Sequence, residues 1–401
     1  MRVKSNSTSR FSARRVLPQL VLRLRQLSTI FLIRLLYYSK LDSVVRVLSR
    51  TYYIQPAASS RTPRIRRHLR GKFGILCYHR VGMEGVPIYS RLHPEAFENQ
   101  MWYLRKHYRL VSLGQLCQEI REERVVPPTL TVTFDDGYKD LYKFAFPVLQ
   151  RYSVPATIYL IGRCIEAGEV PWYDRIFLML KTIQDISLEM DLDVPRSFSL
   201  RSEKERMDAA WEIICFLRSI PDARRRSWCA EMQRRFAMNE ADLAGRMLDL
   251  TQVREMHRCG IDFGAHTMSH PVVSRLDPAH FSEELSASKR LLENSLDAPI
   301  QDFAYPFGKS ADIHDAAQAF LERSGYRSAV TTMEGFNSWG ANPFALRRMQ
   351  VGDDRSLANF SFRICQMFLT GPSDSSSGKM SGLDQSPVFH DATEMSERVL
   401  G

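Results

Sequence analysis

The chain has 401 residues, of which 44% are hydrophobic and 25% are charged, so it can bury a substantial core. Its seven cysteines are odd in number, widely scattered and never spaced as CxxC, which excludes a disulfide framework and a thiolate zinc site. We therefore expect a globular protein of a reducing compartment, the cytoplasm, with one large domain and appendages or two modest domains.

The net charge of +10 is concentrated at the amino terminus. Residues 1–70 hold sixteen Lys or Arg and a single acid, Asp42, so the rest of the chain carries a net charge of −5. We interpret residues 1–71 as a basic arm and linker. Either the arm contacts anionic phospholipid headgroups, at the inner face of the membrane, or it is a solvated leader with partial disorder. No specific nucleic-acid partner is expected.

The longest apolar stretch of this arm, residues 26–39, is interrupted by Arg34 and is shorter than the roughly 20 apolar residues that cross a bilayer. No small-residue cleavage site follows it closely, which favours a retained leader over a cleaved signal peptide. Its apolar residues recur at helical spacing, as in an interfacial helix or, more simply, a packed one.

The main domain is expected to begin near Lys72, after a linker with prolines and a basic run, and to extend to residue 370. Its first half alternates β-rich runs with helical segments. The pattern predicts strands at residues 73–78, 130–134 and 156–161 and helices at residues 94–107 and 140–152. Strands that alternate with helices favour a parallel sheet, open or closed into a barrel.

A long, charged, helix-rich stretch interrupts this alternation, and we interpret it as an insertion over about residues 165–250. Beyond it, Asp277 and Pro278 have the residue types that cap and begin a helix. The pattern predicts further strands at residues 261–264, 303–305 and 327–331 and a helix at residues 313–325. The tail, residues 371–401, is rich in Ser, Gly and Asp and is predicted to be disordered.

Two adjacent carboxylates, Asp135 and Asp136, stand where a β-branched run ends and Gly137 begins a loop. In a β/α barrel, the carboxyl end of a strand lies at the catalytic face. At a bend both side chains can reach one cavity, one as a hard oxygen ligand and the other as a base. In isolation, however, Asp-Asp-Gly is also an ordinary turn sequence.

Two histidines, His266 and His270, stand four residues apart in a loop between Gly264 and Pro271. Imidazoles at this spacing can share one face of a turn and bind a divalent ion together with a carboxylate. A set of two histidines and one aspartate with an open position is typical of catalytic zinc. The alternative for this segment alone is a polar loop with two surface histidines.

Four segments of the chain occur in the order that resembles the polysaccharide deacetylase, or NodB-homology, family, which is carbohydrate esterase family 4. They are TFDDGY at residues 133–138, VPATIYLI at 154–161, HTMSHP at 266–271 and FAYPFG at 303–308. An earlier segment, GILCYHRVG at residues 74–82, is similar to the opening strand of members that deacetylate poly-N-acetylglucosamine. The resemblance covers about residues 72–360 and implies a distorted (β/α) barrel with a helical insertion.

The resemblance also implies roles for individual residues. Asp135 matches the general base of the family, and Asp136, His266 and His270 match its metal ligands, with zinc as the expected ion. The implied reaction is metal-assisted hydrolysis of N-acetyl groups on amino sugars in a glycan, in which Asp135 takes a proton from the attacking water. A backbone amide near Phe307, in the segment that also contains Tyr305, is expected to stabilise the oxyanion.

Two departures from the family pattern lead to further candidates. Ala304 replaces the arginine that usually braces the catalytic aspartate, and Arg348 is the candidate substitute; otherwise Arg348 is a surface residue on a strand edge. The LxH motif that usually carries the general acid is absent, and His390 lies in the tail. His79, at the end of the first strand, is then the candidate acid, with an unperturbed pKa of about 6.5; otherwise it only hydrogen-bonds a neighbouring loop.

Three alternatives to N-deacetylation stay open from the sequence. The same site suits an O-acetyl esterase, and the missing LxH motif suits a non-catalytic relative that binds metal and carbohydrate. The basic arm suits a tethered scaffold. The aromatic residues that open the insertion, Trp172 and Tyr173, have the spacing of a helix core and are assigned to packing rather than to sugar contact.

Overall fold

The computed structural model describes residues 71–83, 91–124, 128–236, 245–352 and 356–370. The basic arm and the tail at residues 371–401, which was predicted to be disordered, lie outside the described residues. Within the described part, no helix combines the length and the apolar character needed to cross a bilayer.

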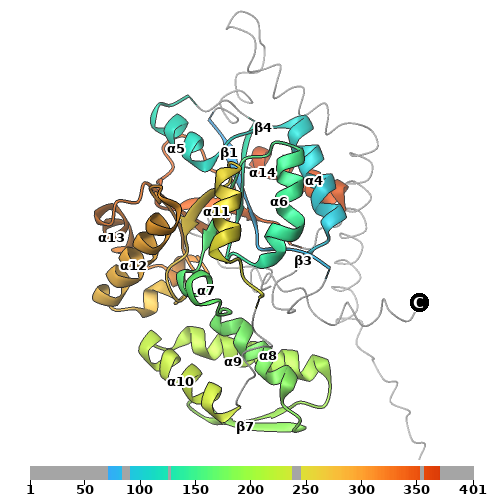
Figure 1. The fold of residues 1–401 in the computed structure, drawn as a ribbon, viewed down its shortest axis with the longest axis vertical. Coiled ribbons are helices and arrows are strands. Elements are labelled where there is room, and N and C mark those ends of the chain that lie inside the picture. Colours follow the sequence, from blue (N-terminus) through green and yellow to red (C-terminus); the bar gives the residue numbers. More distant parts are fainter. Residues whose placement is uncertain (1–70, 84–90, 125–127, 237–244, 353–355, 371–401) are drawn as a thin grey trace, which may run out of the picture.

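Seven parallel strands close into a barrel, which confirms the fold expected from the sequence (Figure 1). The barrel closes because β5 pairs along its whole length with β1, from Phe73 opposite Thr129 to Tyr78 opposite Phe134. A short strand, β4 (Arg109–Leu110), extends the sheet beside β5. In sheet order the barrel strands are β1 (Phe73–Tyr78), β12 (Leu346–Gln350), β11 (Ser328–Glu334), β10 (Asp302–Ala304), β9 (Asp262–Ala265), β6 (Ala156–Leu160) and β5 (Thr129–Phe134).

The barrel strands are buried on both faces, which explains why their sequences form continuous β-rich runs. Every residue of β1, β5 and β6 is buried. One face of such a strand fills the barrel interior and the other packs under helices. The threonines of β5 satisfy their hydroxyls locally, since Thr131 donates to the carbonyl of Val111 and Thr133 to that of Leu76.

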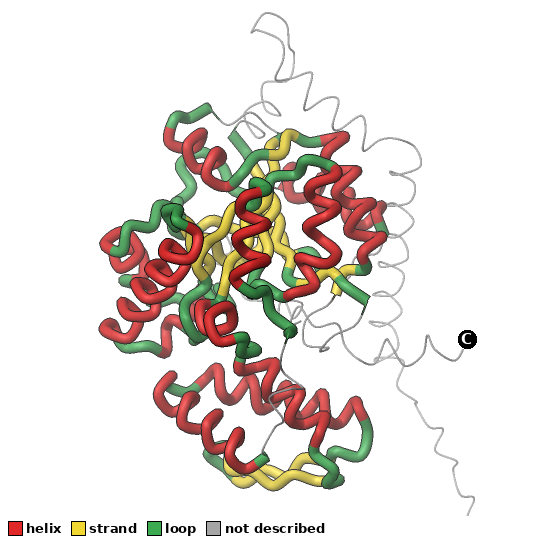
Figure 2. The backbone as a smooth tube through the Cα atoms, in the orientation of Figure 1, coloured by secondary structure: helices red, strands yellow, loops and turns green. Residues whose placement is uncertain are grey.

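Helices cover the outside of the barrel, as the red segments around the yellow strands show in Figure 2. The predicted helix that starts with Pro278 is confirmed, because the Asp277 carboxylate accepts hydrogen bonds from the amides of Ala279 and His280. The covering helices are α4 (Pro94–His107), α5 (Leu113–Arg121), α6 (Phe146–Arg151), α7 (Gly162–Ala167), α11 (Leu250–Arg258), α12 (Pro278–Leu296), α13 (Ala317–Arg323) and α14 (Leu357–Thr370).

Several element boundaries differ from the sequence predictions. The helix expected at residues 140–152 is a π-helical turn, Leu141–Ala145, followed by α6, because Pro147 has no N–H with which to continue a regular α-helix. The helix expected at residues 313–325 begins only at Ala317, after the 3-10 turn Ser310–Asp312. The helices α5, α11 and α14 were not predicted. Short parallel strands β2 (Arg80–Val81) and β3 (Arg91–Leu92) and a 3-10 turn, Val273–Arg275, complete the main domain.

The insertion forms a separate layer at one end of the barrel (Figure 1). It has its own hydrophobic core, built from residues of α8, α9, α10 and a hairpin. The insertion was predicted to be rich in helices, and its hairpin was not predicted; strand β7 of this hairpin alternates exposed and buried residues. The elements are α8 (Trp172–Thr182), β7 (Ser187–Asp191), β8 (Pro195–Ser199), α9 (Glu203–Ser219) and α10 (Asp222–Arg235).

Candidate active site

The side chains singled out in the sequence gather at the carboxyl ends of the barrel strands. Parallel strands end at one face, so residues far apart in the chain converge there. Arg348 reaches the same place from within β12. The others directly follow their strands: His79 after β1, Asp135 and Asp136 after β5, His266 after β9 and Tyr305 after β10.

Asp136, His266 and His270 present three ligand atoms to one point. The Nε2 atoms of both histidines lie 3.6 Å from Oδ1 of Asp136. Two ligand atoms about 2.1 Å from a tetrahedrally coordinated ion are about 3.4 Å apart, so this spacing fits a divalent cation such as zinc. All three side chains are buried.

The surroundings of the Asp136 carboxylate support this fit. Both of its oxygens are buried without a hydrogen bond from the described residues. Burial, together with the Asp135 and Asp174 carboxylates, raises the pKa of Asp136 well above its usual range. A buried carboxylate without donors is costly, whereas a cation at this point would stabilise its ionised form.

The histidines are in the state that metal binding needs. Burial lowers the pKa of both His266 and His270, so both imidazoles are neutral near neutral pH. Nδ1 of His266 lies 2.7 Å from the carbonyl oxygen of Ala304. A carbonyl oxygen can only accept a hydrogen bond, so Nδ1 carries the proton of this neutral imidazole. The lone pair of Nε2 is therefore left for an ion. Ala304, which replaces the family's arginine, thus acts through its backbone.

Glu284 of α12 holds the histidine loop, a role that the sequence analysis missed. Its carboxylate accepts hydrogen bonds from the backbone amides of Met268, at 2.7 Å, and Ser269, at 3.0 Å. It also accepts one from the Ser269 hydroxyl at 2.6 Å. These donors lie between the two candidate histidine ligands in the chain, so Glu284 fixes the spacing of the pair.

His270 is oriented by packing instead of by a hydrogen bond to its second ring nitrogen. Nδ1 of His270 is buried and accepts or donates no hydrogen bond among the described residues. The rings of Tyr173 and Phe307 lie 5.0 Å and 4.8 Å from its ring, and Nε1 of Trp172 donates to its carbonyl oxygen. Trp172 and Tyr173 are buried, as predicted, but their packing also orients a candidate metal ligand.

Backbone strain is concentrated at this site. Among the described residues, eight that are not glycine have a positive φ. Four of them belong to the site: Asp136, Thr267, His270 and Phe307. Such conformations cost on the order of 1–3 kcal/mol each and persist where surrounding contacts enforce them, most often at functional sites.

Arg348 pairs with Asp135 through two parallel hydrogen bonds. Its Nη1 and Nη2 atoms lie 2.7 Å and 2.6 Å from the two carboxylate oxygens. Arg348 is fully buried, so the alternative of a surface arginine is wrong. Burial disfavours the charged carboxylate, but the guanidinium outweighs it and holds the pKa of Asp135 well below its usual range. Asp135 therefore stays ionised.

His79 and Cys77 also lie close to the Asp135 carboxylate. Nε2 of His79 is 3.9 Å from Oδ2 of Asp135, and Sγ of Cys77 is 3.5 Å from the same oxygen. Burial lowers the pKa of His79 to about 4, with Arg348 acting in the same direction, so His79 is neutral near neutral pH. The unperturbed pKa assumed from the sequence does not apply. Burial also raises the pKa of Cys77 and keeps its thiol protonated. The positive charge of Arg348 disfavours a metal ion among Cys77, His79 and Asp135.

The loop after β10 presents a free amide at Phe307. Phe307 has a φ of 59°, and its N–H donates to no acceptor among the described residues. The next residue must be glycine, since a Cβ on Gly308 would lie 2.8 Å from the amide nitrogen of Thr332. Tyr305 corrects the prediction: its amide donates to Val330 and its hydroxyl to Phe344, so it supports the loop and is not an oxyanion donor.

Comparisons with known proteins agree with this architecture. The family model described as polysaccharide deacetylase matches residues 122–193 and 230–329. The relative YxkH of Bacillus subtilis, whose name refers to polysaccharide deacetylases, is 22% identical over 300 residues, which cover 74% of this chain and 77% of the relative. The poly-β-1,6-N-acetyl-D-glucosamine N-deacetylase of Escherichia coli is 30% identical over 97 residues, 23% of this chain and 14% of that protein.

A solved structure shares the fold. The deacetylase PplD of Streptococcus pyogenes, in complex with acetate, superposes with a TM-score of 0.51 at 19% identity and covers 74% of this chain and 98% of its own. The mouth of the closed (β/α) barrel carries an Asp-His-His cluster that could hold a metal ion. The chain belongs to the polysaccharide deacetylase family.

The Arg348–Asp135 pair predicts a large loss of stability in Arg348→Met. This substitution leaves the Asp135 carboxylate buried without its partner, which should lower the free energy of unfolding by about 3–5 kcal/mol. Adding Asp135→Asn should recover part of that loss but no activity. Urea denaturation measures the effect. The control Arg347→Met, at the partly exposed neighbour, should cost less than about 1 kcal/mol; equal midpoints for the two single variants would contradict the pairing.

The Glu284 contacts predict that Glu284→Ala weakens metal binding about 10- to 100-fold while the fold is kept, because the histidine loop loses its brace. Competition of Zn²⁺ between the protein and a chelator measures the affinity. Glu283→Ala, one position along α12 and exposed, is the matched control. Equal Zn²⁺ affinities of the two variants would show that Glu284 does not position the ligands.

Proposed function

We propose that the protein is a zinc-dependent deacetylase that hydrolyses N-acetyl groups of amino sugars in a polysaccharide or other glycan. One observation carries the proposal. A buried carboxylate without donors lies 3.6 Å from two neutral imidazoles, and the adjacent carboxylate is held ionised by a buried arginine. The site thus offers a cation position beside a fixed base, which is what hydrolysis of an unactivated amide needs.

The donor set favours zinc. Two imidazole nitrogens and one carboxylate oxygen leave a tetrahedral ion with an open position, as in catalytic zinc sites. Asp136, His266 and His270 would hold the ion. When bound, it would supply a Lewis acid that polarises the acetyl carbonyl.

The side chains of this protein supply the proton transfers. Asp135 takes a proton from the water that attacks the acetyl carbon, and Arg348 keeps it ionised and oriented for that step. The N–H of Phe307 stabilises the negative charge on the carbonyl oxygen. His79 is neutral at rest and lies 3.9 Å from Asp135, so it can receive the proton there and donate it to the amine nitrogen as the C–N bond breaks. The products are acetate and the free amino sugar.

The substrate class is proposed from chemistry and from a relative. The Escherichia coli relative is named for N-deacetylation of poly-β-1,6-N-acetyl-D-glucosamine, and it shares 30% identity over 97 residues with this chain. An N-acetyl group on a glucosamine-type sugar is therefore the favoured substrate. O-acetyl esters fit the same site and form the alternative. The cytoplasmic location, and the contact of residues 1–71 with an anionic membrane, stay predictions from the sequence.

The division between ligands and base predicts two different kinds of inactive variant. Asp136→Ala, His266→Ala and His270→Ala should each lose bound zinc and activity together, whereas Asp135→Asn should keep the metal and lose turnover. Metal content per protein and acetate release from an N-acetylglucosamine oligosaccharide measure the two properties. The exposed histidine variant His280→Ala is the control. Full activity in the two histidine-ligand variants, or purified protein without a stoichiometric divalent ion, would refute the assignment.

The position of His79 predicts that His79→Gln retains zinc and fold but lowers kcat on an N-acetyl substrate by at least about 100-fold. The same variant should lose less activity on an O-acetyl ester, because an alkoxide leaves more readily than an unprotonated amine. Initial rates on paired N-acetyl and O-acetyl sugars test this. A near-normal kcat on the N-acetyl sugar would leave His79 as a loop-fixing residue only.

A further inference from the structure

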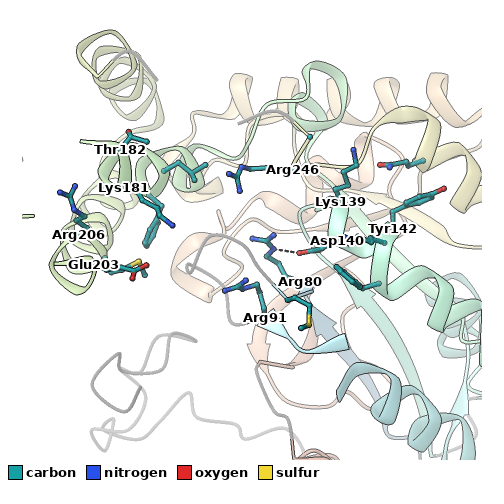
Figure 3. A pocket seen from close by; sticks show the side chains of 18 of the residues that line it. Arg80, Arg91, Lys139, Asp140, Tyr142, Lys181, Thr182, Glu203, Arg206 and Arg246 are labelled. Atoms are coloured by element: carbon teal, nitrogen blue, oxygen red, sulfur yellow. Dashed lines mark hydrogen bonds and ion pairs between the residues drawn. The ribbon is translucent and has the colours of Figure 1, made fainter. Parts of the chain in front are cut away.

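A large basic cavity lies between the mouth of the barrel and the insertion. Its volume is about 1420 Å³, and residues that follow β1 and β5 line one side while residues of α8 and α9 line the other. Figure 3 shows Arg80, Lys139 and Asp140 on the barrel side of this cavity and Lys181 and Arg206 on the insertion side.

The cavity concentrates positive charge on a body that is otherwise acidic. Seven Lys or Arg side chains line it, against two carboxylates, while residues 71–401 together carry a net charge of −5. One of the two carboxylates, Asp140, already pairs with Arg80 at 2.8 Å. The seven are Arg80, Arg91, Lys139, Lys143, Lys181, Arg206 and Arg246.

Three of these side chains have no carboxylate of their own. Among the described residues, no acid lies within ion-pair distance of Lys139, Lys143 or Lys181. Like charges that converge on a hollow repel one another, and this cost is offset when an anion enters. The arrangement is therefore that of an anion site and differs from a solvated face, where charges of both signs are interspersed.

The cavity adjoins the candidate active site. Arg80 follows His79 in the chain, and its guanidinium lies 4.4 Å from the ring centroid of Tyr138, two residues beyond Asp136. The Tyr138 hydroxyl in turn donates to Asp174 at the start of α8. The amide of Lys139 donates to the carbonyl oxygen of Arg246. A ligand that extends from the active site toward α8 would thus meet the basic side chains.

We infer that this cavity binds anionic groups, carboxylate or phosphate, carried by the same glycan strand whose N-acetyl group lies in the active site. The inference rests on the proposed function and narrows the substrate class to acidic N-acetylated glycans. Guanidinium groups pair with carboxylates and phosphates through two hydrogen bonds, and lysines add point charges. A lipid surface is the less suitable anion, because these side chains converge on a cavity between two layers of the protein.

The test compares binding of two end-labelled hexasaccharides to the holoenzyme at low salt by fluorescence anisotropy. One is hyaluronan, in which N-acetylglucosamine alternates with a carboxylate-bearing sugar, and the other is the neutral chitohexaose. The double variant Lys139→Ala/Lys181→Ala removes one unpaired lysine from each side of the cavity. Lys106→Ala/Lys204→Ala is the matched control, since it removes the same charge from the barrel and the insertion outside the cavity.

The wild-type protein should bind hyaluronan more tightly than chitohexaose. The cavity variant should lose about 5- to 20-fold of its hyaluronan affinity and none of its chitohexaose affinity, and the control should match the wild type. Inorganic pyrophosphate should displace hyaluronan from the wild type; the stronger competitor of free glucuronate and pyrophosphate identifies the preferred anion.

Equal hyaluronan affinities of the cavity and control variants would overturn the inference. So would a cavity variant that keeps its glycan affinity but no longer sediments with phosphatidylglycerol vesicles, because the site would then serve a lipid surface. Acetate release, measured on the same samples, distinguishes a failure of this inference from a failure of the proposed function. Turnover of chitohexaose without a charge preference contradicts only the inference, and lysine-dependent binding without turnover contradicts only the proposed function.

Discussion

The buried ion pair between Arg348 and Asp135 is the interaction on which the rest of the site depends. Besides its two bonds to Asp135, Arg348 donates from Nε to the carbonyl of Thr331 at 2.7 Å and from Nη1 to the hydroxyl of Thr133 at 3.3 Å. One side chain therefore joins β12, β11 and the end of β5 inside the closed barrel. Neither charge can be left alone there without a large desolvation cost, so the fold and the ionised base are maintained together.

This pair also separates the roles of two adjacent carboxylates. Burial raises the pKa of both, but Arg348 reverses the effect at Asp135 and leaves Asp136 with neighbours that are themselves acidic. Asp135 is thus an anion whose oxygens are held by the Arg348 guanidinium, and Asp136 is a carboxyl group that ionises favourably only next to a cation. The surroundings thus suit two chemically identical side chains to the proposed roles of base and ligand, as they do for carboxylate pairs in other hydrolytic sites.

Much of this arrangement could be predicted from the sequence. Runs such as residues 73–78 and 130–134, alternating with helical segments, indicated a parallel sheet, and the family resemblance implied that this sheet closes into a barrel. The Asp-Asp pair and the two histidines could be assigned to one site, because the carboxyl ends of parallel strands lie at the same face of a barrel. Arg348 was a candidate from local pattern, but only the closed barrel reveals that β12 lies beside β1 and aims this side chain at Asp135. The lowered pKa of His79 results mainly from its burial in the folded barrel and could not be inferred from residue type.

The features that could not be predicted from the sequence are contacts between segments far apart in the chain. Such contacts leave no recognisable pattern in the sequence of either segment. Glu284 is one of several acids on an amphipathic helix, and its role depends on how α12 lies against the histidine loop. The packing of Tyr173 on His270 likewise depends on the placement of α8. Because Phe307 also packs against the core of the insertion, that layer contacts both the candidate metal ligand His270 and the loop proposed to hold the oxyanion. In this account the insertion supports the candidate active site and is more than an appendage.

The central claim is that Asp136, His266 and His270 form the cation site while Asp135 is kept from binding metal by Arg348. Anomalous X-ray scattering at the zinc edge, from crystals of the protein grown with Zn²⁺, tests it most directly. The account predicts one strong peak about 2.0–2.2 Å from Nε2 of both histidines and from a carboxylate oxygen of Asp136. A peak among Cys77, His79 and Asp135 instead, or no ordered zinc at the barrel mouth, would contradict it.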